Sequence, residues 1–357
     1  MSNTNMIRAA RLHGPEDLRV EDVPHPGDPP QGQVLLRVEV VGICGSDLHT
    51  YRHARIGDTQ LAAPLILGHE FAGIVEQADA DCLDGHGHPL SAGTRVAVDP
   101  AQPCGRCEWC LRGDPNLCPQ IVFCGLFPHE GALRPWMHVP AASCFPVPAG
   151  MDATTAMMLE PLGVAIHSLD LAKVRLGESV AVIGTGPIGL CLLRLSAAAG
   201  GGPLFAADRL PWRVRLAADF GPSTAYCTPD TDFVQAVLEA TGGRGVDVAF
   251  EAASGGEALQ QAADILAPGG RLIAVGVDED DRFVLRHSTL RRKGLTIRMV
   301  RRMKHSYARA IHLAEHGQID LRALVSHHYP LEQAPQAFAA NAAYREGVVK
   351  VAVDCQV

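Results

Sequence analysis

Thiol, imidazole and carboxylate side chains stand in three short stretches of this sequence that lie far apart along the chain. They are Gly42-Ile43-Cys44-Gly45-Ser46-Asp47-Leu48-His49, then Gly68-His69-Glu70, then Glu160-Pro161. A single cysteine is usually only a small apolar residue. Combined with an imidazole and a carboxylate, it becomes part of a ligand set that suits Zn2+. The three stretches together predict a zinc site with a carboxylate beside it.

A second group of thiols is closely spaced. Two, two and seven residues separate its members, which are Cys104, Cys107, Cys110 and Cys118. Four thiolates complete a tetrahedral zinc site and leave no coordination position open for a substrate. Residues 100–120 are poor in apolar side chains, so burial alone would not fold them. The spacing therefore predicts a structural zinc that folds this lobe.

A phosphate-binding turn is predicted at Gly184-Thr185-Gly186-Pro187-Ile188-Gly189. The apolar run 179–183 precedes it as a strand, and the run 190–199 follows it as a helix. A second strand, 203–207, leads to Asp208. This order is that of a dinucleotide-binding unit, in which glycines let the backbone approach the pyrophosphate at the start of the helix.

The residues after the second strand bear on the choice of dinucleotide. Asp208 would accept hydrogen bonds from the ribose hydroxyls and would repel a 2′-phosphate, which favours NAD. Arg209 and Arg213 keep NADP open, because either guanidinium could meet that phosphate if Asp208 turned aside.

The surrounding patterns predict the elements that position these residues. The alternating run 33–41 is a strand leading to Cys44, and 71–75 is a strand following Glu70. Polar residues 79–93 form a surface loop in which His86 and His88 face solvent. The later elements are a strand at 246–250, a helix at 257–266, a turn at Pro268-Gly269-Gly270, a strand at 271–275, a helix at 307–316 and a strand at 348–353.

Composition restricts the class of protein. The chain has 357 residues, 47% of them hydrophobic and 20% charged, with a net charge of −8. These values predict a folded, two-domain protein that binds neither nucleic acid nor a membrane. The polar residues 1–6 predict no secretory signal, and eleven cysteines without one predict reduced thiols in the cytoplasm.

These motifs occur in the order found in a known family. The chain resembles the zinc-containing medium-chain alcohol dehydrogenases, above all the polyol (sorbitol-type) dehydrogenases and L-threonine 3-dehydrogenase. The resemblance implies an α/β protein with a GroES-like, β-rich catalytic domain and a Rossmann domain with a doubly wound parallel sheet. It assigns 1–157 and 297–357 to the catalytic domain and 158–296 to the NAD-binding domain. It also implies a homotetramer or homodimer.

The resemblance further implies roles for single residues. Cys44 and His69 would bind the catalytic zinc. Either Glu70 or Glu160 would supply a carboxylate ligand, the other contacting zinc-bound water or substrate. Arg302 would contact the hydroxyl groups of the substrate, and Tyr51 is a further candidate for the substrate pocket.

The reaction that the resemblance implies is hydride transfer from a secondary alcohol of a polyol or sugar-like substrate to NAD. Zinc with an open position would act as a Lewis acid toward the hydroxyl group. Ser46 would accept the proton and His49 would carry it to solvent. L-Threonine 3-dehydrogenase or another hydroxy-substrate dehydrogenase is an alternative activity. A zinc- or nucleotide-binding structural protein is the non-enzymatic alternative.

Overall fold

The computed structural model describes residues 6–221, 223–228, 230–345 and 347–356. It divides into two compact units: Met1–Glu160 with Tyr307–Val357, and Pro161–Ser306. Residues 1–5, which enter the prediction about a secretory signal, lie outside the described residues. In the described part, no helix combines the length and the apolar character needed to cross a membrane.

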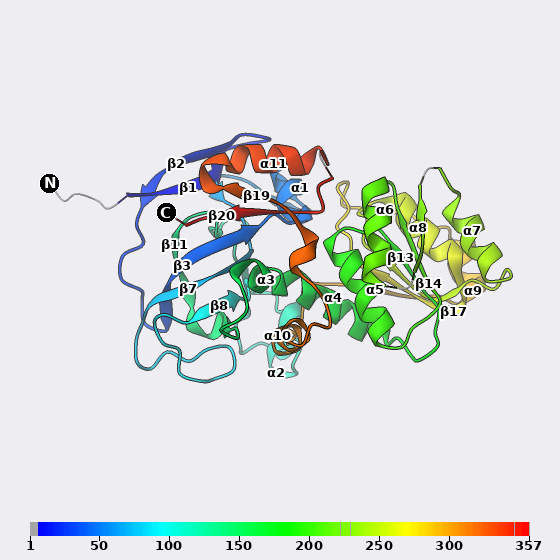
Figure 1. Cartoon of the computed structure of the whole chain (residues 1–357), viewed down its shortest axis with the longest axis horizontal. Coiled ribbons are helices and arrows are strands. Elements are labelled where there is room, and N and C mark those ends of the chain that lie inside the picture. The colour runs from blue at the N-terminus through cyan, green and yellow to red at the C-terminus, as the bar shows by residue number, and fades with distance from the viewer. Residues whose placement is uncertain (1–5, 222, 229, 346, 357) are drawn as a thin grey trace. The chain divides into compact units, whose positions relative to one another are not determined.

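The first unit is built around a mixed sheet in which β3 (Gln33–Gly42) is a central strand. On one side β3 pairs with β7 (Glu70–Ala78), and on the other with β20 (Lys350–Asp354), both antiparallel. Figure 1 shows β20, from the end of the chain, beside β3 from its beginning. The other strands of this sheet are β8 (Arg95–Val98), β11 (Trp136–Pro140), β12 (Cys144–Pro146) and β19 (Val325–Pro330).

Smaller sheets and helices complete this unit. The strands are β1 (Met6–Leu12), β2 (Leu18–Pro24), β4 (Arg55–Ile56), β5 (Thr59–Gln60), β6 (Leu65–Ile66), β9 (Ala101–Gln102) and β10 (Val122–Phe123). The helices are α1 (Gly45–His53), α2 (Glu108–Leu111), α3 (Ala153–Met157), the start of α4 (Leu159–Ala172), α10 (Tyr307–Glu315) and α11 (Ala334–Ala342).

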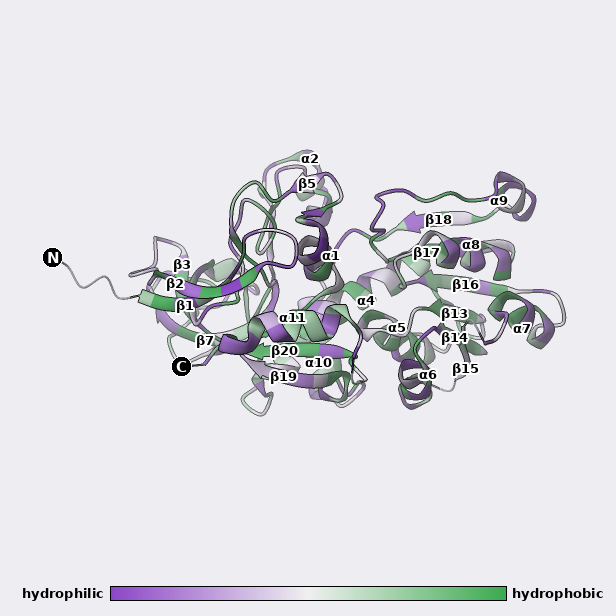
Figure 2. Ribbon diagram, turned by 90° about the horizontal axis from the view of Figure 1, so that it is seen from above, coloured by the Kyte–Doolittle hydropathy of each residue, from purple (hydrophilic) through white to green (hydrophobic). Residues whose placement is uncertain are grey.

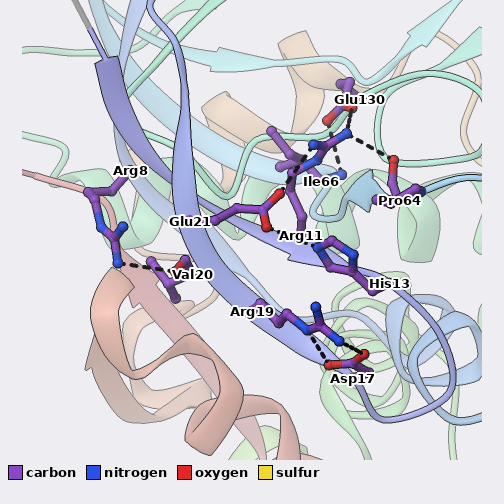
Figure 3. A network of polar contacts seen from close by, with 10 residues as sticks. All are labelled: Arg8, Arg11, His13, Asp17, Arg19, Val20, Glu21, Pro64, Ile66 and Glu130. Atoms are coloured by element: carbon purple, nitrogen blue, oxygen red, sulfur yellow. Dashed lines mark hydrogen bonds and ion pairs between the residues drawn. The ribbon is translucent and has the colours of Figure 1, made fainter.

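A polar network fixes the strand that leads to His69. The Arg11 side chain bridges Glu21 at 3.2 Å and Glu130 at 3.5 Å. The other oxygen of Glu130 accepts the backbone N–H of Ile66 at 3.0 Å. Figure 3 shows these contacts joining β1 and β2 to β6. The segment that ends in Gly68-His69 is thereby tied to two other parts of the unit.

The second unit contains a parallel sheet with the strand order β15-β14-β13-β16-β17-β18. The apolar strands fit burial on both faces, and Figure 2 shows β16 largely in the hydrophobic colour. Its strands are β13 (Val180–Ile183), β14 (Leu204–Asp208), β15 (Ser223–Cys227), β16 (Val246–Glu251), β17 (Leu266–Ala274) and β18 (Thr296–Met299). Its helices are the rest of α4, α5 (Pro187–Ala198), α6 (Pro211–Ala217), α7 (Phe233–Ala240), α8 (Gly256–Ile265) and α9 (His287–Lys293).

One predicted local feature differs from the structure, and a second, the surface loop 79–93, is confirmed, although it contains buried residues. The predicted turn Pro268-Gly269-Gly270 lies inside strand β17, whose pairing register with β16 shifts there. Gly269 has a φ of 78°, so the stretch bends the strand without ending it. In the predicted surface loop, Asp84 is buried and accepts the backbone N–H groups of His86 and His88, whereas both imidazoles are exposed.

Candidate functional site

The residues predicted to hold the catalytic metal come together in the first unit. One ligand atom each from Cys44, His69 and Glu70 lies within 4.8 Å of the other two. Cys44 follows strand β3 and precedes helix α1, while His69 and Glu70 stand at the start of β7, where Glu70 pairs with Gly42. A thiol, an imidazole and a carboxylate within this distance form a donor set that fits Zn2+.

Asp47 orients two members of this group. One oxygen of its carboxylate accepts the backbone N–H of Cys44 at 2.9 Å, which caps the start of α1. The other oxygen lies 3.3 Å from His69 Nδ1. This contact fixes the imidazole so that Nε2 is the nitrogen available to a metal.

Charges around His69 also favour metal binding. Burial by itself lowers the pKa of His69, but the Asp47 carboxylate and the Cys44 thiolate raise it well above its usual range. The ring therefore sits in a field that attracts positive charge at Nε2. A divalent cation would replace that proton, because only the neutral ring is a ligand.

Glu160 lies in the first turn of helix α4 and is buried. Burial raises the pKa of its carboxyl group to about 8. Among the described residues, the cluster within 4.8 Å contains Glu70 and leaves Glu160 out. The arrangement thus favours Glu70 as the ligand and leaves Glu160 available for hydrogen bonds nearby.

Of the residues predicted to transfer protons or contact substrate, Ser46 lies beside His69, whereas the others lie elsewhere in the two units. The Ser46 hydroxyl is 3.5 Å from His69 Nε2, and His49 is buried in α1 rather than at the surface. Tyr51 is 6% exposed and packs against Phe338 with ring centroids 5.4 Å apart, which is the environment of a core residue. Arg302 belongs to the second unit and has a φ of 57°.

The four closely spaced cysteines also converge. Their sulfur atoms lie within 4.8 Å of one another, and those of Cys107 and Cys110 are 3.5 Å apart. Hydrogen bonds from the backbone, first that of Arg106, lower the pKa of the Cys104 thiol to about 6. All eleven cysteines are described, and each is a free thiol. Four free thiols at this spacing fit a closed zinc site.

The predicted phosphate-binding turn joins β13 to α5 in the second unit. Gly184 has a φ of 91°, and a Cβ on Gly189 would lie 1.8 Å from the Gly184 carbonyl oxygen. Both positions therefore require glycine. Gly186 is the N-cap of α5, and Pro187 and Ile188 are its first residues. Backbone N–H groups at such a helix start bind phosphate.

Two charged side chains border this turn. The Asp208 carboxylate, at the end of β14, accepts the backbone N–H of Thr185 at 2.8 Å and that of Leu210 at 2.9 Å. A Cβ on Gly186 would lie 3.5 Å from an Arg213 guanidinium nitrogen, so Arg213 covers the turn. A negative and a positive side chain thus both lie beside the turn expected to bind the dinucleotide.

Two residues that contact the cluster of Cys44, His69 and Glu70 received no role from the sequence. Asp47 was visible as an acid in the first turn of a helix that starts after Cys44. Lys350 was visible as the one charged residue in the apolar run 348–353. It is buried and forms an ion pair with Glu70.

Two family models match the chain. One, described as the alcohol dehydrogenase GroES-like domain, matches residues 30–149, and the other, described as zinc-binding dehydrogenase, matches residues 187–316. These matches and the solved structures below confirm the predicted α/β fold class, with a GroES-like and a Rossmann-type part.

The chain is similar to named enzymes along nearly its whole length. It is 33% identical to sorbitol dehydrogenase of Bacillus subtilis, covering 97% of both chains. It is 32% identical to the probable D-xylulose reductase A of Emericella nidulans, covering 92% of this chain and 91% of that protein. A Sinorhizobium meliloti protein described as a putative zinc-binding dehydrogenase, solved with NADP bound, is 29% identical with a TM-score of 0.88, and the match covers 98% of this chain and 99% of that chain.

Proposed function

The chain belongs to the zinc-binding alcohol dehydrogenase family, and from this premise we propose that it oxidises a secondary hydroxyl group of a polyol or sugar-like substrate with NAD as hydride acceptor. The convergence of Cys44, His69 and Glu70 within 4.8 Å carries the proposal. The named relatives act on polyols and their ketose products. They are enzymes, which favours this activity over a structural role.

The chain's own residues have distinct tasks in this proposal. Cys44, His69 and Glu70 would hold a Zn2+, which would supply the Lewis acidity that lowers the pKa of an alcohol. Ser46 Oγ receives the hydroxyl proton, and His49 passes it on toward solvent. Glu160 hydrogen-bonds the substrate or a water molecule, and Arg302 contacts substrate hydroxyl groups. The reaction converts the secondary alcohol and NAD+ to a ketone, NADH and a proton.

The dinucleotide choice follows from the turn in the second unit. Gly184, Gly186 and Gly189 let the backbone approach the pyrophosphate, and Asp208 stands where a 2′-phosphate would meet negative charge. Arg213 is assigned to the pyrophosphate side of the turn that it covers. The family uses NAD(P), and these residues favour NAD.

A substrate panel followed by NADH absorbance tests the proposal. It includes sorbitol, xylitol, L-arabinitol and L-threonine, each with NAD and with NADP, and zinc is measured on the same sample. We expect the highest kcat/KM for a polyol with NAD. Oxidation of L-threonine alone would replace the proposed substrate class. Cys44→Ala should abolish oxidation and retain NADH binding.

We also propose a cytoplasmic homodimer or homotetramer. The free thiols support a reducing compartment. Strand β18 is an edge strand of the parallel sheet, and its residue Met299 is 56% exposed. An exposed sheet edge with apolar side chains is suited to pairing with another chain. Mass photometry should give twice or four times the chain mass, and a monomer would contradict this assembly.

A further inference from the structure

A buried lysine stands against the carboxylate of the metal cluster. Lys350, on strand β20, is 3% exposed, and its ammonium group forms an ion pair with Glu70 Oε2. The same nitrogen donates a hydrogen bond to the carbonyl oxygen of Ile43 at 3.1 Å. Burying a lysine is costly unless it is paired, so this position requires a partner. Glu70 is that partner.

The two side chains meet because a glycine lies between their strands. Strand β3 pairs with β7 on one side and with β20 on the other, and its last residue is Gly42. A Cβ on Gly42 would lie 2.5 Å from Glu70 Oε2 and 3.1 Å from Lys350 Cε. The φ of Gly42 is outside the left-handed region, so space and not backbone conformation demands glycine here. The absence of a side chain at Gly42 therefore leaves the space in which Glu70 and Lys350 form their ion pair.

This pairing leaves Glu70 with two positive partners. Together with Glu70, Cys44 and His69 form a ligand set for a divalent cation. Lys350 already forms an ion pair with one oxygen of the Glu70 carboxylate. The negative charge of one carboxylate is thus divided between a lysine and a metal.

We propose that Lys350 is a positioning residue that shares Glu70 with the zinc, holding Oε2 so that only Oε1 is offered to the metal. This inference rests on the proposed function of the cluster. Because the ammonium withdraws charge from the carboxylate, zinc receives less electron density and stays a stronger Lewis acid. Because the ammonium also neutralises Glu70 when no metal is bound, it stabilises the metal-free protein.

Removal of the ammonium group should therefore tighten zinc binding while it impairs turnover. In Lys350→Met, we expect a zinc Kd at least about tenfold lower than in the wild type. We expect kcat to fall about tenfold with little change in KM. Thermal unfolding should show a larger loss of stability for the zinc-free variant than for the zinc-loaded one. A lysine with a merely structural role would lower both stabilities equally.

The experiment measures zinc Kd by chelator competition at pH 8 in the full chain, with thermal unfolding in the presence and absence of zinc. Lys350→Gln is a second variant, because an amide can still donate to the Ile43 carbonyl and only the charge is lost. Lys350→Arg should restore the wild-type values. Lys293→Met is the matched control, since Lys293 donates to backbone carbonyls in the second unit. It should lower stability and leave zinc affinity unchanged.

A double variant separates the pair from other effects. In a Glu70→Gln background, Lys350→Met should leave zinc affinity nearly unchanged, because no carboxylate remains to be shared. The cobalt-substituted Lys350→Met protein should show shifted visible absorption bands, which report a changed ligand field. Unchanged or weaker zinc binding in both Lys350→Met and Lys350→Gln would overturn the proposal. A wild type that binds only the zinc of the four cysteines would instead overturn the proposed function itself.

Discussion

At the scale of single residues, Asp47 links Cys44 and His69, two proposed ligands that are distant in sequence. Its carboxylate contacts the Cys44 backbone and the His69 ring, so one side chain sets both the start of α1 and the orientation of the imidazole. Residue type and order predicted a zinc site in these stretches, and the resemblance implied Cys44 and His69 as ligands while leaving the choice between Glu70 and Glu160 open. Asp47 and Lys350 were not predicted, because their roles depend on contacts between β7, α1 and β20 that no local pattern contains.

Replacing Asp47 by asparagine tests this link. In Asp47→Asn, the ring of His69 loses its charged partner, and we expect zinc affinity and kcat to fall by about 10–100-fold. Chelator competition and steady-state kinetics measure the two quantities. Asp17→Asn serves as the control, because Asp17 pairs with Arg19 at the surface. Equal effects of the two substitutions would show that Asp47 has no special role.

At the scale of elements, we expect the four-cysteine lobe to depend on a bound zinc. Helix α2 spans only Glu108–Leu111 and has no buried residue, so apolar packing contributes little to it. The sequence predicted that these four thiols come together, because all four lie within fifteen residues. Local spacing is sufficient when a metal, and not tertiary packing, supplies the folding energy.

Cys107→Ser should remove the lobe's zinc and lower stability. We expect Tm to fall by about 5–10 °C. Several kcal/mol of stabilisation by metal binding are lost, and each kcal/mol of stability shifts Tm by about 2–4 °C in a large domain. Activity per remaining zinc should stay within about threefold of the wild type. Calorimetry measures Tm, and metal analysis measures the zinc that remains bound. Loss of activity with an unchanged Tm would assign this metal to catalysis.

A second element-scale prediction concerns the tie between β13 and β16. The Asp247 carboxylate accepts hydrogen bonds from the Ser179 hydroxyl at 2.7 Å and from Arg244 at 2.6 Å. Burial raises the pKa of Asp247, but the hydrogen bonds of Arg244 and Ser179 outweigh it and lower the pKa to about 2. A lowered pKa stabilises the folded state at pH values above the unfolded pKa of 3.8. That contribution is lost as the pH falls toward 2.

Asp247→Asn should therefore cost about 1–2 kcal/mol of unfolding free energy at pH 7. Urea unfolding at several pH values measures this loss. The difference between wild type and variant should be constant from about pH 8 to 5 and should shrink below about pH 4. A difference that grows on acidification would mean that the folded state does not hold this carboxylate charged.

At the scale of the whole molecule, the order of motifs predicted the class of fold better than it predicted local detail. The strand–turn–helix pattern around Gly184 indicated a parallel sheet, because each apolar strand is followed by a helix of the right length. The stretch 268–270 was read as a turn, because Pro-Gly-Gly usually ends a strand. Pairing of β17 with both β16 and β18 overrides that local preference. The terminal strand predicted that the chain returns to the first domain, but the pairing of β20 with β3 is a tertiary contact that no local pattern specifies.

The central claim is that Cys44, His69 and Glu70 bind one metal ion. Anomalous diffraction from crystals of the zinc-loaded protein, measured at the zinc absorption edge, tests it most directly. We expect two peaks per chain, one among the four cysteines and one about 2.3 Å from Cys44 Sγ and about 2.0–2.1 Å from His69 Nε2. A single peak at the four-cysteine lobe, with none within bonding distance of Cys44 and His69, would contradict the claim.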